Sequence, residues 1–368
     1  MRIVVAPDSF KGSLSALEAA EAIRRGAERA SPELQVDVCP LSDGGEGVAD
    51  TIVTALGGAA HFADVTGPIG NGVQARWIML ADGKTAIIES AAAIGLGLVA
   101  PSLRAPLETT SYGVGELIRA AIGAGAHKVI VGLGGTATTD GGAGMAQALG
   151  VTFQGAATPL VGGRLKEVVG IDVRTRAVRE DVELLVLSDV DNPLTGAEGA
   201  AMTYAPQKGA SEEQARTLDL ALLHLAKLAG DPGFERGDGA AGGLGYGLRV
   251  LAGARIVSGI EFVLDAVGFD AKLENCVLVI TGEGRLDGQS ARGKVVAGVC
   301  RRCRARQIPV IALAGAIGAG ASTLYDQGMT GFFSLCDGSI SEHEAMKRGF
   351  ELLEALAFNV CRSIFSSR

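Results

Sequence analysis

The stretch that most constrains how this chain can fold is residues 129–144, VIVGLGGTATTDGGAG. An apolar run, typical of a buried strand, leads directly into a segment that contains six glycines, three threonines and Asp140. Glycine allows positive φ angles and a close approach of backbone to ligand, so consecutive N–H groups can converge on one anion. A helix predicted to begin near Gly142 would direct its positive end toward the same place. The stretch therefore favours an anion-binding strand-loop-helix unit over a tight turn in which glycine serves packing alone.

The composition is typical of a layered α/β enzyme. The chain has 368 residues with 54 glycines, 48% hydrophobic and 4% aromatic residues, and its length predicts one large or two medium domains. A net charge of −8 without clusters of Lys and Arg argues against nucleic acid as a partner. No run reaches the ~18 apolar residues of a membrane span, and the first residues lack the features of a signal peptide. We therefore expect no membrane partner and a cytoplasmic location.

Six cysteines fit the same expectation, because disulfides are rare in the reducing cytosol. Cys300 and Cys303 form a single CxxC in an Arg-rich helical stretch, with neither a second pair nor a nearby histidine. This spacing favours buried free thiols over a zinc or redox site.

Two strand-loop-helix units are predicted at the start of the chain. Residues 2–6 and 36–41 have the pattern of strands, and each strand leads into a polar loop and then a helix, the first of which starts at a Ser15–Glu18 capping box. Ligands bind outside the carboxyl ends of strands in open parallel sheets, so the charged residues of both loops are expected at one edge. Turn formation or helix capping would explain each acidic residue alone. These roles explain less well why both loops carry acidic residues.

The pattern changes between residues 61 and 90, where alternating stretches are separated by Asn71-Gly72 and Asp82-Gly83. Such dipeptides form hairpin turns, so this region predicts antiparallel strands and the start of a second domain. Further along, a strand at 184–187 ends in the acidic loop SDVDNP, and residues 239–247 form a second glycine-rich loop.

The strand-helix alternation resumes after Cys276. We expect a strand at 277–281, a loop at 282–287, a helix near 290–305 and further strands at 308–312 and 331–335. The predicted fold class is α/β: a doubly wound, Rossmann-like parallel sheet domain, residues 1–63 and 263–368, with a second α/β domain inserted. The insert, residues 64–262, is expected to contain a mixed sheet. The active site is expected in the cleft between the two domains.

Two familiar nucleotide-binding fingerprints nearly match and are rejected. Gly132 to Ala137 fits GxGxxA, but no acid follows about 20 residues later to hold a ribose. Gly288 to Lys294 fits GxxxxGK through Gly293, but Val295 stands where a Ser or Thr should contact Mg²⁺.

The remaining pattern is two glycine-rich loops, acids at five strand ends and a few lysines. Phosphoryl transfer needs N–H donors for phosphates, carboxylates for Mg²⁺ and for the attacking alcohol, and cations for developing charge. Hydride transfer would not need so many acids, and metal hydrolases usually show more histidines than the four found here. The pattern therefore favours a small-molecule kinase.

Seven motifs in order closely resemble the bacterial glycerate kinase family: APDSFKGSLSA (6–16), PLSDGGEG (40–47), GLGGTATTDGGAGM (132–145), SDVDNPLTG (188–196), APQKGA (205–210), GAAGGLG (239–245) and TGEGRLDGQSARGK (281–294). The resemblance spans nearly the whole chain. It implies ATP-dependent phosphorylation of D-glycerate, most often to 2-phosphoglycerate, by a two-domain α/β enzyme with an active site in its cleft.

Chemical roles placed on these motifs give the candidate site. We predict Asp189 as the base, with Lys11, Lys208 and Lys294 as catalytic cations. ATP phosphates are expected at Gly134, Gly135, Thr136, Thr138, Asp140 and Gly243. Glycerate is expected at Asp8, Ser9, Lys11, Asp43 and Glu46, and Mg²⁺ at Asp191, Glu283 and Asp287.

Several alternatives stay open at this point. The product could be 3-phosphoglycerate, the substrate another small hydroxy acid, or the chain a non-catalytic protein that binds an anionic metabolite. Carboxylates in five loops favour catalysis over sensing, because they would repel an anionic ligand without benefit to a sensor. The oligomeric state is also open, with a homodimer among the states to be tested.

Overall fold

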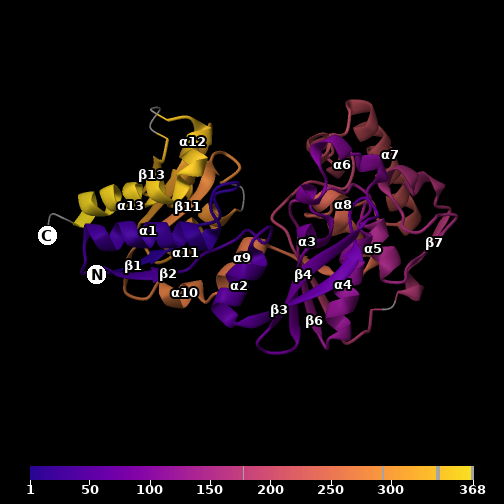
Figure 1. Cartoon of the computed structure of the whole chain (residues 1–368), viewed down its shortest axis with the longest axis horizontal. Helices are drawn as coiled ribbons and strands as arrows, with labels where there is room; N and C mark the ends of the chain where they lie inside the picture. Colours follow the sequence, from indigo (N-terminus) through magenta and orange to yellow (C-terminus); the bar gives the residue numbers. More distant parts are fainter. Residues whose placement is uncertain (177, 292–293, 337–339, 366–368) are drawn as a thin grey trace. The chain divides into compact units, whose positions relative to one another are not determined.

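The computed structural model describes residues 1–176, 178–291, 294–336 and 340–365. The chain divides into two compact units, each with a large sheet of its own (Figure 1). Unit 1 consists of Met1–Asp43, Asp50–Ala55 and Ile260–Arg368, and unit 2 of Gly44–Ala49 and Leu56–Gly259. The domain boundaries expected from the sequence, 63/64 and 262/263, stay predictions.

Unit 1 contains a five-stranded parallel sheet in the order β13-β12-β11-β1-β2. The strands are β1 (Arg2–Val5), β2 (Gln35–Val38), β11 (Cys276–Leu286), β12 (Val310–Ile317) and β13 (Gly331–Ser334). From β1 the chain moves to β2 on one side, whereas β11, β12 and β13 build outward on the other. The order therefore reverses between β1 and β11, as the predicted doubly wound sheet requires.

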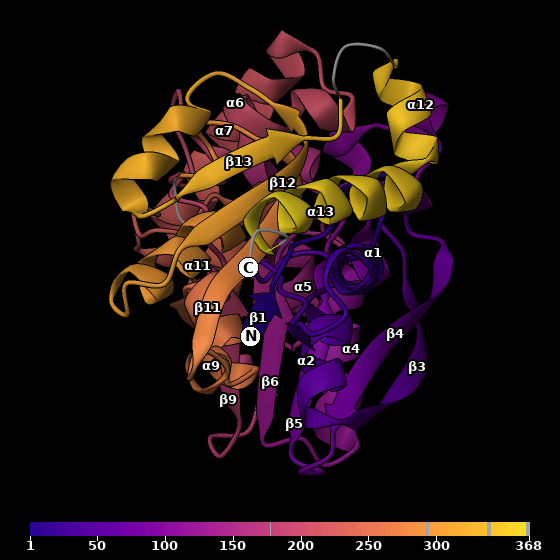
Figure 2. The same cartoon turned by 90° about the vertical axis from the view of Figure 1, so that its left-hand side faces the viewer.

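Helices lie on both faces of this sheet. Helix α1 (Ala16–Ala30) begins with the predicted capping box, in which Ser15 and Glu18 exchange hydrogen bonds. It packs beside α13 (Gly349–Phe365) over a core that includes Ile3 and Val5 (Figure 2). Val4 is also fully buried and faces the other side of the sheet, because side chains alternate along a strand. Helix α11 (Val295–Arg304) packs against β11 and β12 outside the α1/α13 core cluster. The remaining helices are α2 (Val48–Leu56), α9 (Gly259–Ala266), α10 (Phe269–Lys272) and α12 (Glu342–Lys347).

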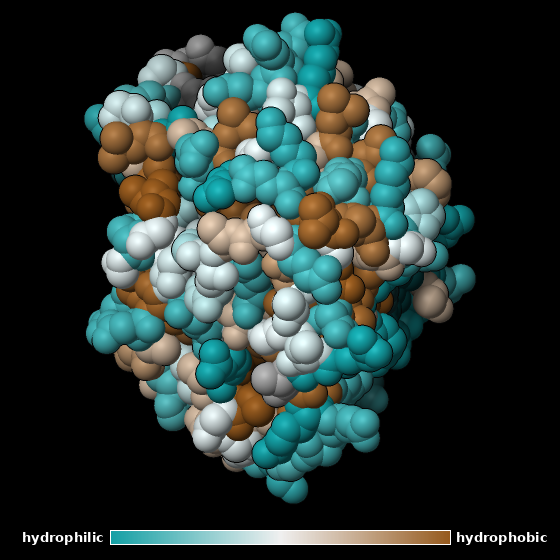
Figure 3. Space-filling view, turned by 90° about the vertical axis from the view of Figure 1, so that its right-hand side faces the viewer, coloured by the Kyte–Doolittle hydropathy of each residue, from teal (hydrophilic) through white to brown (hydrophobic). Residues whose placement is uncertain are grey.

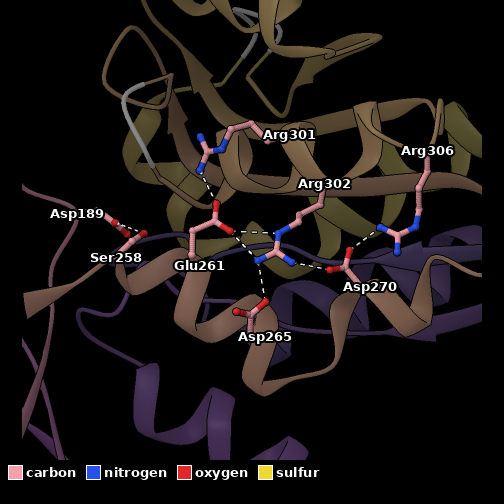
Figure 4. Close-up of polar contacts among 8 residues, drawn as sticks. All are labelled: Asp189, Ser258, Glu261, Asp265, Asp270, Arg301, Arg302 and Arg306. Atoms are coloured by element: carbon pink, nitrogen blue, oxygen red, sulfur yellow. Dashed lines mark hydrogen bonds and ion pairs between the residues drawn. The ribbon is translucent and has the colours of Figure 1, made fainter.

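Arg302 on α11 connects three helices of unit 1. Its guanidinium forms ion pairs of 2.6 Å with Glu261, 2.7 Å with Asp265 and 2.5 Å with Asp270, which lie on α9, on α9 and on α10 (Figure 4). Arg301 adds a second bond to Glu261. This network fixes α9 and α10 against the helix that follows β11.

Unit 2 contains a mixed sheet in the order β10-β9-β6-β5-β4-β3. Its strands are β3 (Gly58–Thr66), β4 (Gly72–Leu80), β5 (Thr85–Glu89), β6 (Lys128–Gly132), β9 (Glu183–Leu187) and β10 (Arg255–Val257), with β7 (Thr152–Gln154) and β8 (Gly170–Asp172) as a separate pair. In the six-stranded sheet, the β3–β4 and β4–β5 pairs are antiparallel and the β5–β6, β6–β9 and β9–β10 pairs are parallel, and the separate β7–β8 pair is antiparallel. The mixed sheet and both predicted hairpins are thereby confirmed.

The helices of unit 2 cover one face of this sheet and share one core with it. They are α3 (Ser90–Ile94), α4 (Tyr112–Gly123), α5 (Ala143–Ala148), α6 (Ala200–Tyr204), α7 (Glu212–Ala229) and α8 (Ala240–Tyr246). The capping box predicted from Ser211 and Gln214 starts α7. On the face drawn in Figure 3, hydrophobic residues are scattered among hydrophilic ones. In the described part of the chain, no helix has the length and apolarity needed to cross a membrane.

The C-terminal elements differ from the sequence prediction in two places. The expected loop at 282–287 is wrong for residues 282–286, because β11 continues to Leu286 and pairs with β12 up to Ile317. Helix α11 begins at Val295 rather than near residue 290, and Gly293 of the rejected GxxxxGK match lies outside the described residues. Glycine is used here for close packing, since a Cβ on Gly315 would lie 2.4 Å from the Gly284 carbonyl oxygen.

The second glycine-rich segment also differs from the prediction. Residues 239–247 were expected to form a loop, but Ala240–Tyr246 is helical with a kink at Ala241, Gly242 and Gly243, which all have positive φ. A Cβ on Gly242 would lie 2.0 Å from the Thr138 carbonyl oxygen. The glycines therefore allow this segment to pack directly against the 129–144 stretch.

Candidate active site

A cavity of about 290 Å³ opens in unit 1 where β1 ends and β11 continues. The loop after β1 stays beside β11, because the Asp8 N–H donates a 2.8 Å hydrogen bond to the Gly282 carbonyl. This is the point at which the strand order reverses, and ligands bind at such points in open parallel sheets. Charged groups of both signs line the cavity: Asp8, Lys11, Asp43, Glu283, Arg285, Asp287 and Lys294.

Four of the five residues predicted to bind the substrate meet in this cavity. Asp8, Ser9 and Lys11 come from the loop after β1, and Asp43 from the loop after β2. The fifth, Glu46, is exposed in unit 2, where its Oε2 lies 3.9 Å from the Cβ that Gly135 would carry.

Burial raises the pKa of two acids in the cavity. Burial and the nearby charges of Asp43 and Glu283 together raise the pKa of Asp8 to about 8, although the 2.6 Å bond from the Ser9 N–H and the charge of Lys11 oppose the shift. Burial also raises the pKa of Glu283, against a hydrogen bond from Ser290 and the charge of Lys294. Both carboxyl groups thus lack the solvation that an ionised acid needs.

The predicted Mg²⁺ ligands belong to different units. Asp287 pairs with Arg285 at 3.5 Å, and Asp191 is in unit 2, where it pairs with Arg236 at 2.6 Å. No group of three or more His, Cys, Asp or Glu side chains in residues 1–176, 178–291, 294–336 and 340–365 could hold a metal ion. The assignment of Mg²⁺ to Asp191, Glu283 and Asp287 stays a prediction.

The glycine stretch of unit 2 presents only its tip to solvent. Gly135 is exposed and Gly134 half-buried, while Thr136 is buried and Thr138 fully so. Its backbone is fixed to residues 94–96, since the Leu96 N–H donates to the Gly135 carbonyl and the Ala137 N–H to the Ile94 carbonyl. The tip at Gly134 and Gly135 is the part that can reach a phosphate directly.

The buried side chain of Asp140 holds this loop together through hydrogen bonds. It is fully buried and accepts hydrogen bonds of 2.8 and 2.7 Å from the N–H and Oγ of Ser111, and of 3.2 Å from the N–H groups of Gly142 and Gly144. Burial raises its pKa and these bonds oppose the shift. The helix end that was expected to face a ligand is therefore satisfied by Asp140, and the side chain of Asp140 holds the loop together.

Lys208 lies beneath the same loop. It is 3% exposed, and its Nζ donates to the Thr138 carbonyl at 2.5 Å and to Thr136 Oγ1 at 3.4 Å. Burial lowers the pKa of Lys208 to about 7, although the charge of Asp140 opposes this shift. Lys208 thus braces the loop from the interior, and Gly243 packs nearby against Gly141.

The predicted base, Asp189, follows β9 and is half-buried. Ser258, which follows the neighbouring strand β10, donates a 2.7 Å hydrogen bond from its Oγ to Asp189 Oδ1 (Figure 4). Ser258 was missed by the sequence analysis. Only the parallel pairing of β9 with β10 brings these two positions together.

An ion network around Arg249 was also missed. Arg249 donates four hydrogen bonds of 2.7 to 2.9 Å to Asp231 and Asp238, and Asp238 is fully buried. The network ties the segment before α8 to the residues after it. Arg285 was quoted within a motif but given no role, although its place two residues from both Glu283 and Asp287 could have indicated a cavity position.

Comparisons with known proteins agree over the whole length of the chain. Residues 3–365 match the family described as the glycerate kinase family. The chain is 44% identical over 367 residues to a glycerate kinase of Halalkalibacterium halodurans, covering 97% of each chain. It is 42% identical to the glycerate 2-kinase of Escherichia coli K12, covering 99% of this chain and 96% of the other. A crystal structure from Salmonella typhimurium LT2, described as a glycerate kinase 2, superposes with a TM-score of 0.83 at 41% identity and covers 100% of this chain and 98% of that one. The chain belongs to the glycerate kinase family.

Proposed function

We propose that this chain is a glycerate kinase that transfers the γ-phosphoryl group of ATP to D-glycerate and forms 2-phosphoglycerate. Its full-length similarity to a glycerate 2-kinase carries the proposal. The cavity of unit 1 supports it, because acids and cations side by side suit a ligand with one carboxylate and two hydroxyl groups.

In this proposal the cavity of unit 1 receives glycerate. Lys11, Arg285 or Lys294 pairs with the substrate carboxylate, and the acids accept hydrogen bonds from its hydroxyl groups. Asp8 and Ser9 line the same cavity and orient the ligand. Such positioning accounts for much of the catalysis of phosphoryl transfer.

We assign the nucleotide to the glycine tip of unit 2. Gly134 and Gly135 are the accessible members of the predicted phosphate site, while Thr136, Thr138, Asp140 and Lys208 shape the tip from inside. Mg²⁺ is proposed to arrive on the ATP phosphates, because nucleotide Mg²⁺ sites use few carboxylates and several phosphate oxygens.

We retain Asp189 as the general base. The substrate oxygen forms a bond to the γ-phosphorus, its proton passes to Asp189, and the bond to the ADP oxygen breaks. The hydrogen bond from Ser258 fixes the orientation of the Asp189 carboxylate. Lys294 is proposed to offset charge on the transferred group.

The first experiment is a transfer assay with ATP, Mg²⁺ and D-glycerate, followed by phosphorus NMR of the product. Coupling of the new signal to one proton indicates O2 as the acceptor, and coupling to two protons indicates O3. If folded protein forms no ADP, the proposal fails, and other hydroxy acids and simple ligand binding become the next tests.

Two wider expectations belong to the same proposal. A cytoplasmic location agrees with six cysteines that are all free thiols. A homodimer is proposed because β3, nine residues long, ends the sheet of unit 2 and pairs on one side only among the described strands, and its Phe62 side chain is 61% exposed. Light scattering after size exclusion tests the dimer.

A further inference from the structure

Glu283 carries an oxygen atom without a partner inside the cavity of unit 1. The residue is 7% exposed, and its Oε1 has no hydrogen-bond partner among the residues that the structure describes. Asp8, in the loop after β1, accepts a bond from the Ser9 N–H. A buried acceptor without a donor is destabilising, and more so when it is charged. A ligand that supplies a donor at Oε1 therefore removes this penalty.

The surroundings of Glu283 limit which ligand group this can be. A substrate carboxylate would be repelled, because Asp43 and Asp287 already place negative charge near Glu283. A metal ion lacks the further protein ligands it would need in the described part of the cavity. Lys294 already contributes positive charge near Glu283. A neutral O–H donor meets the remaining need without adding charge.

We propose that Glu283 accepts a hydrogen bond from the hydroxyl group of the substrate that is not phosphorylated, and so selects a dihydroxy acid over a monohydroxy acid. This inference rests on the proposed function and names a specificity residue for it. A substrate analogue without that hydroxyl leaves the carboxylate buried and unpaired. Sites built to bind a hydroxyl group reject such analogues strongly for this reason.

The test compares D-glycerate with D-lactate, which keeps the 2-hydroxyl group and lacks the 3-hydroxyl group. The wild-type chain should prefer D-glycerate in kcat/KM by roughly 100-fold or more. Glu283→Leu should reduce this preference roughly 10- to 100-fold, mainly by loss of the glycerate rate. Glu283→Gln keeps a neutral acceptor, so its preference for D-glycerate should lie between those of the wild type and Glu283→Leu. Val277→Thr, at an exposed position of the same strand, is the matched control and should keep the wild-type preference.

Binding of both acids without nucleotide, measured by calorimetry, separates this inference from the proposed function. A wild-type chain that forms no ADP refutes the kinase proposal, while the ratio of the two dissociation constants still tests Glu283. An unchanged preference in both Glu283 variants, with normal circular dichroism spectra, overturns the inference. So does a change in the Mg²⁺ requirement without a change in preference. If NMR places the phosphate on O3, 3-hydroxypropionate replaces D-lactate and the same outcomes apply.

Discussion

Lys208 shows how burial of a single charge makes stability depend on pH. Its pKa is about 7 in the folded chain, compared with the ordinary value of 10.5. Between these two pH values the unfolded chain binds more protons than the folded one, so the free energy of unfolding rises with pH. Below pH 7 both states are protonated and the cost of burying the charge is present in full.

We therefore predict that Lys208→Met changes the pH dependence of stability. Between pH 7.5 and 9.5 the wild type should gain up to about 1.4 kcal/mol per pH unit relative to the variant, because one proton separates the two states. Urea unfolding of unit 2 can be followed through the fluorescence of Trp77, the single tryptophan, which is buried in β4. Parallel stability curves for the two proteins would refute a buried neutral lysine.

A second prediction concerns Asp189. If it is the base, Asp189→Asn should lower kcat by roughly 10²- to 10⁴-fold, the usual contribution of proton transfer, with little change in melting temperature. Ser258→Ala should cause a smaller loss, because it removes the orienting bond and leaves the carboxylate. Steady-state kinetics and thermal unfolding of both variants check this. Full turnover by Asp189→Asn would remove Asp189 from the mechanism.

At the residue scale, the sequence was informative where a general rule applied. Asp8, Lys11 and Asp43 follow parallel strands, and the rule that such loops share one edge predicted their meeting correctly. No such rule indicated that Lys208 is buried, because only the packing of distant segments over this side chain removes it from water. Ser258 gave no signal of its own, since a serine after a short strand is a common turn residue.

At the element scale, glycine caused the main errors. Residues 282–287, GEGRLD, were expected to form a loop because glycine usually interrupts strands, yet β11 runs through Gly282 and Gly284. The structure gives the reason: a Cβ on Gly282 would lie 2.2 Å from the Leu313 carbonyl oxygen. Strand pairing that depends on such close approach involves residues far apart in the sequence. By contrast, the capping boxes of α1 and α7 are local signals and were predicted correctly.

The Arg302 network gives a prediction at the same scale. Arg302→Met leaves three acids of α9 and α10 without their shared partner, and its side chain is only 22% exposed. We expect a loss of about 1–3 kcal/mol in stability. The control is Arg301→Met, which removes one pair from a side chain that is 45% exposed and should cost at most about 1 kcal/mol. Thermal unfolding followed by circular dichroism compares them, and equal losses would contradict a central role for Arg302.

At the scale of the whole molecule, the two kinds of sheet were predictable because each has its own sequence pattern. Strands that alternate with helices indicated the parallel sheet of unit 1, and hairpin dipeptides indicated the antiparallel strands of unit 2. The pairing of β1 with β11, which are separated by more than 270 residues, could be predicted only by assigning both segments to one sheet. The strand-helix pattern that resumes after the middle of the chain supported this assignment, which was correct.

If glycerate binds unit 1 and ATP binds unit 2, as proposed, each ligand should protect a different unit from amide exchange. D-glycerate alone should slow amide exchange in the loop after β1 and in the second half of β11, because bound ligand suppresses local opening around its site. A non-hydrolysable ATP analogue alone should slow exchange around Gly134 and Gly135 instead. Lys11→Met should abolish the protection by glycerate and keep that by the nucleotide, because Lys11 lines the cavity of unit 1 and the glycine tip belongs to unit 2. Protection of unit 1 by the nucleotide alone, with none at the glycine tip, would reverse the assignment of the two ligands.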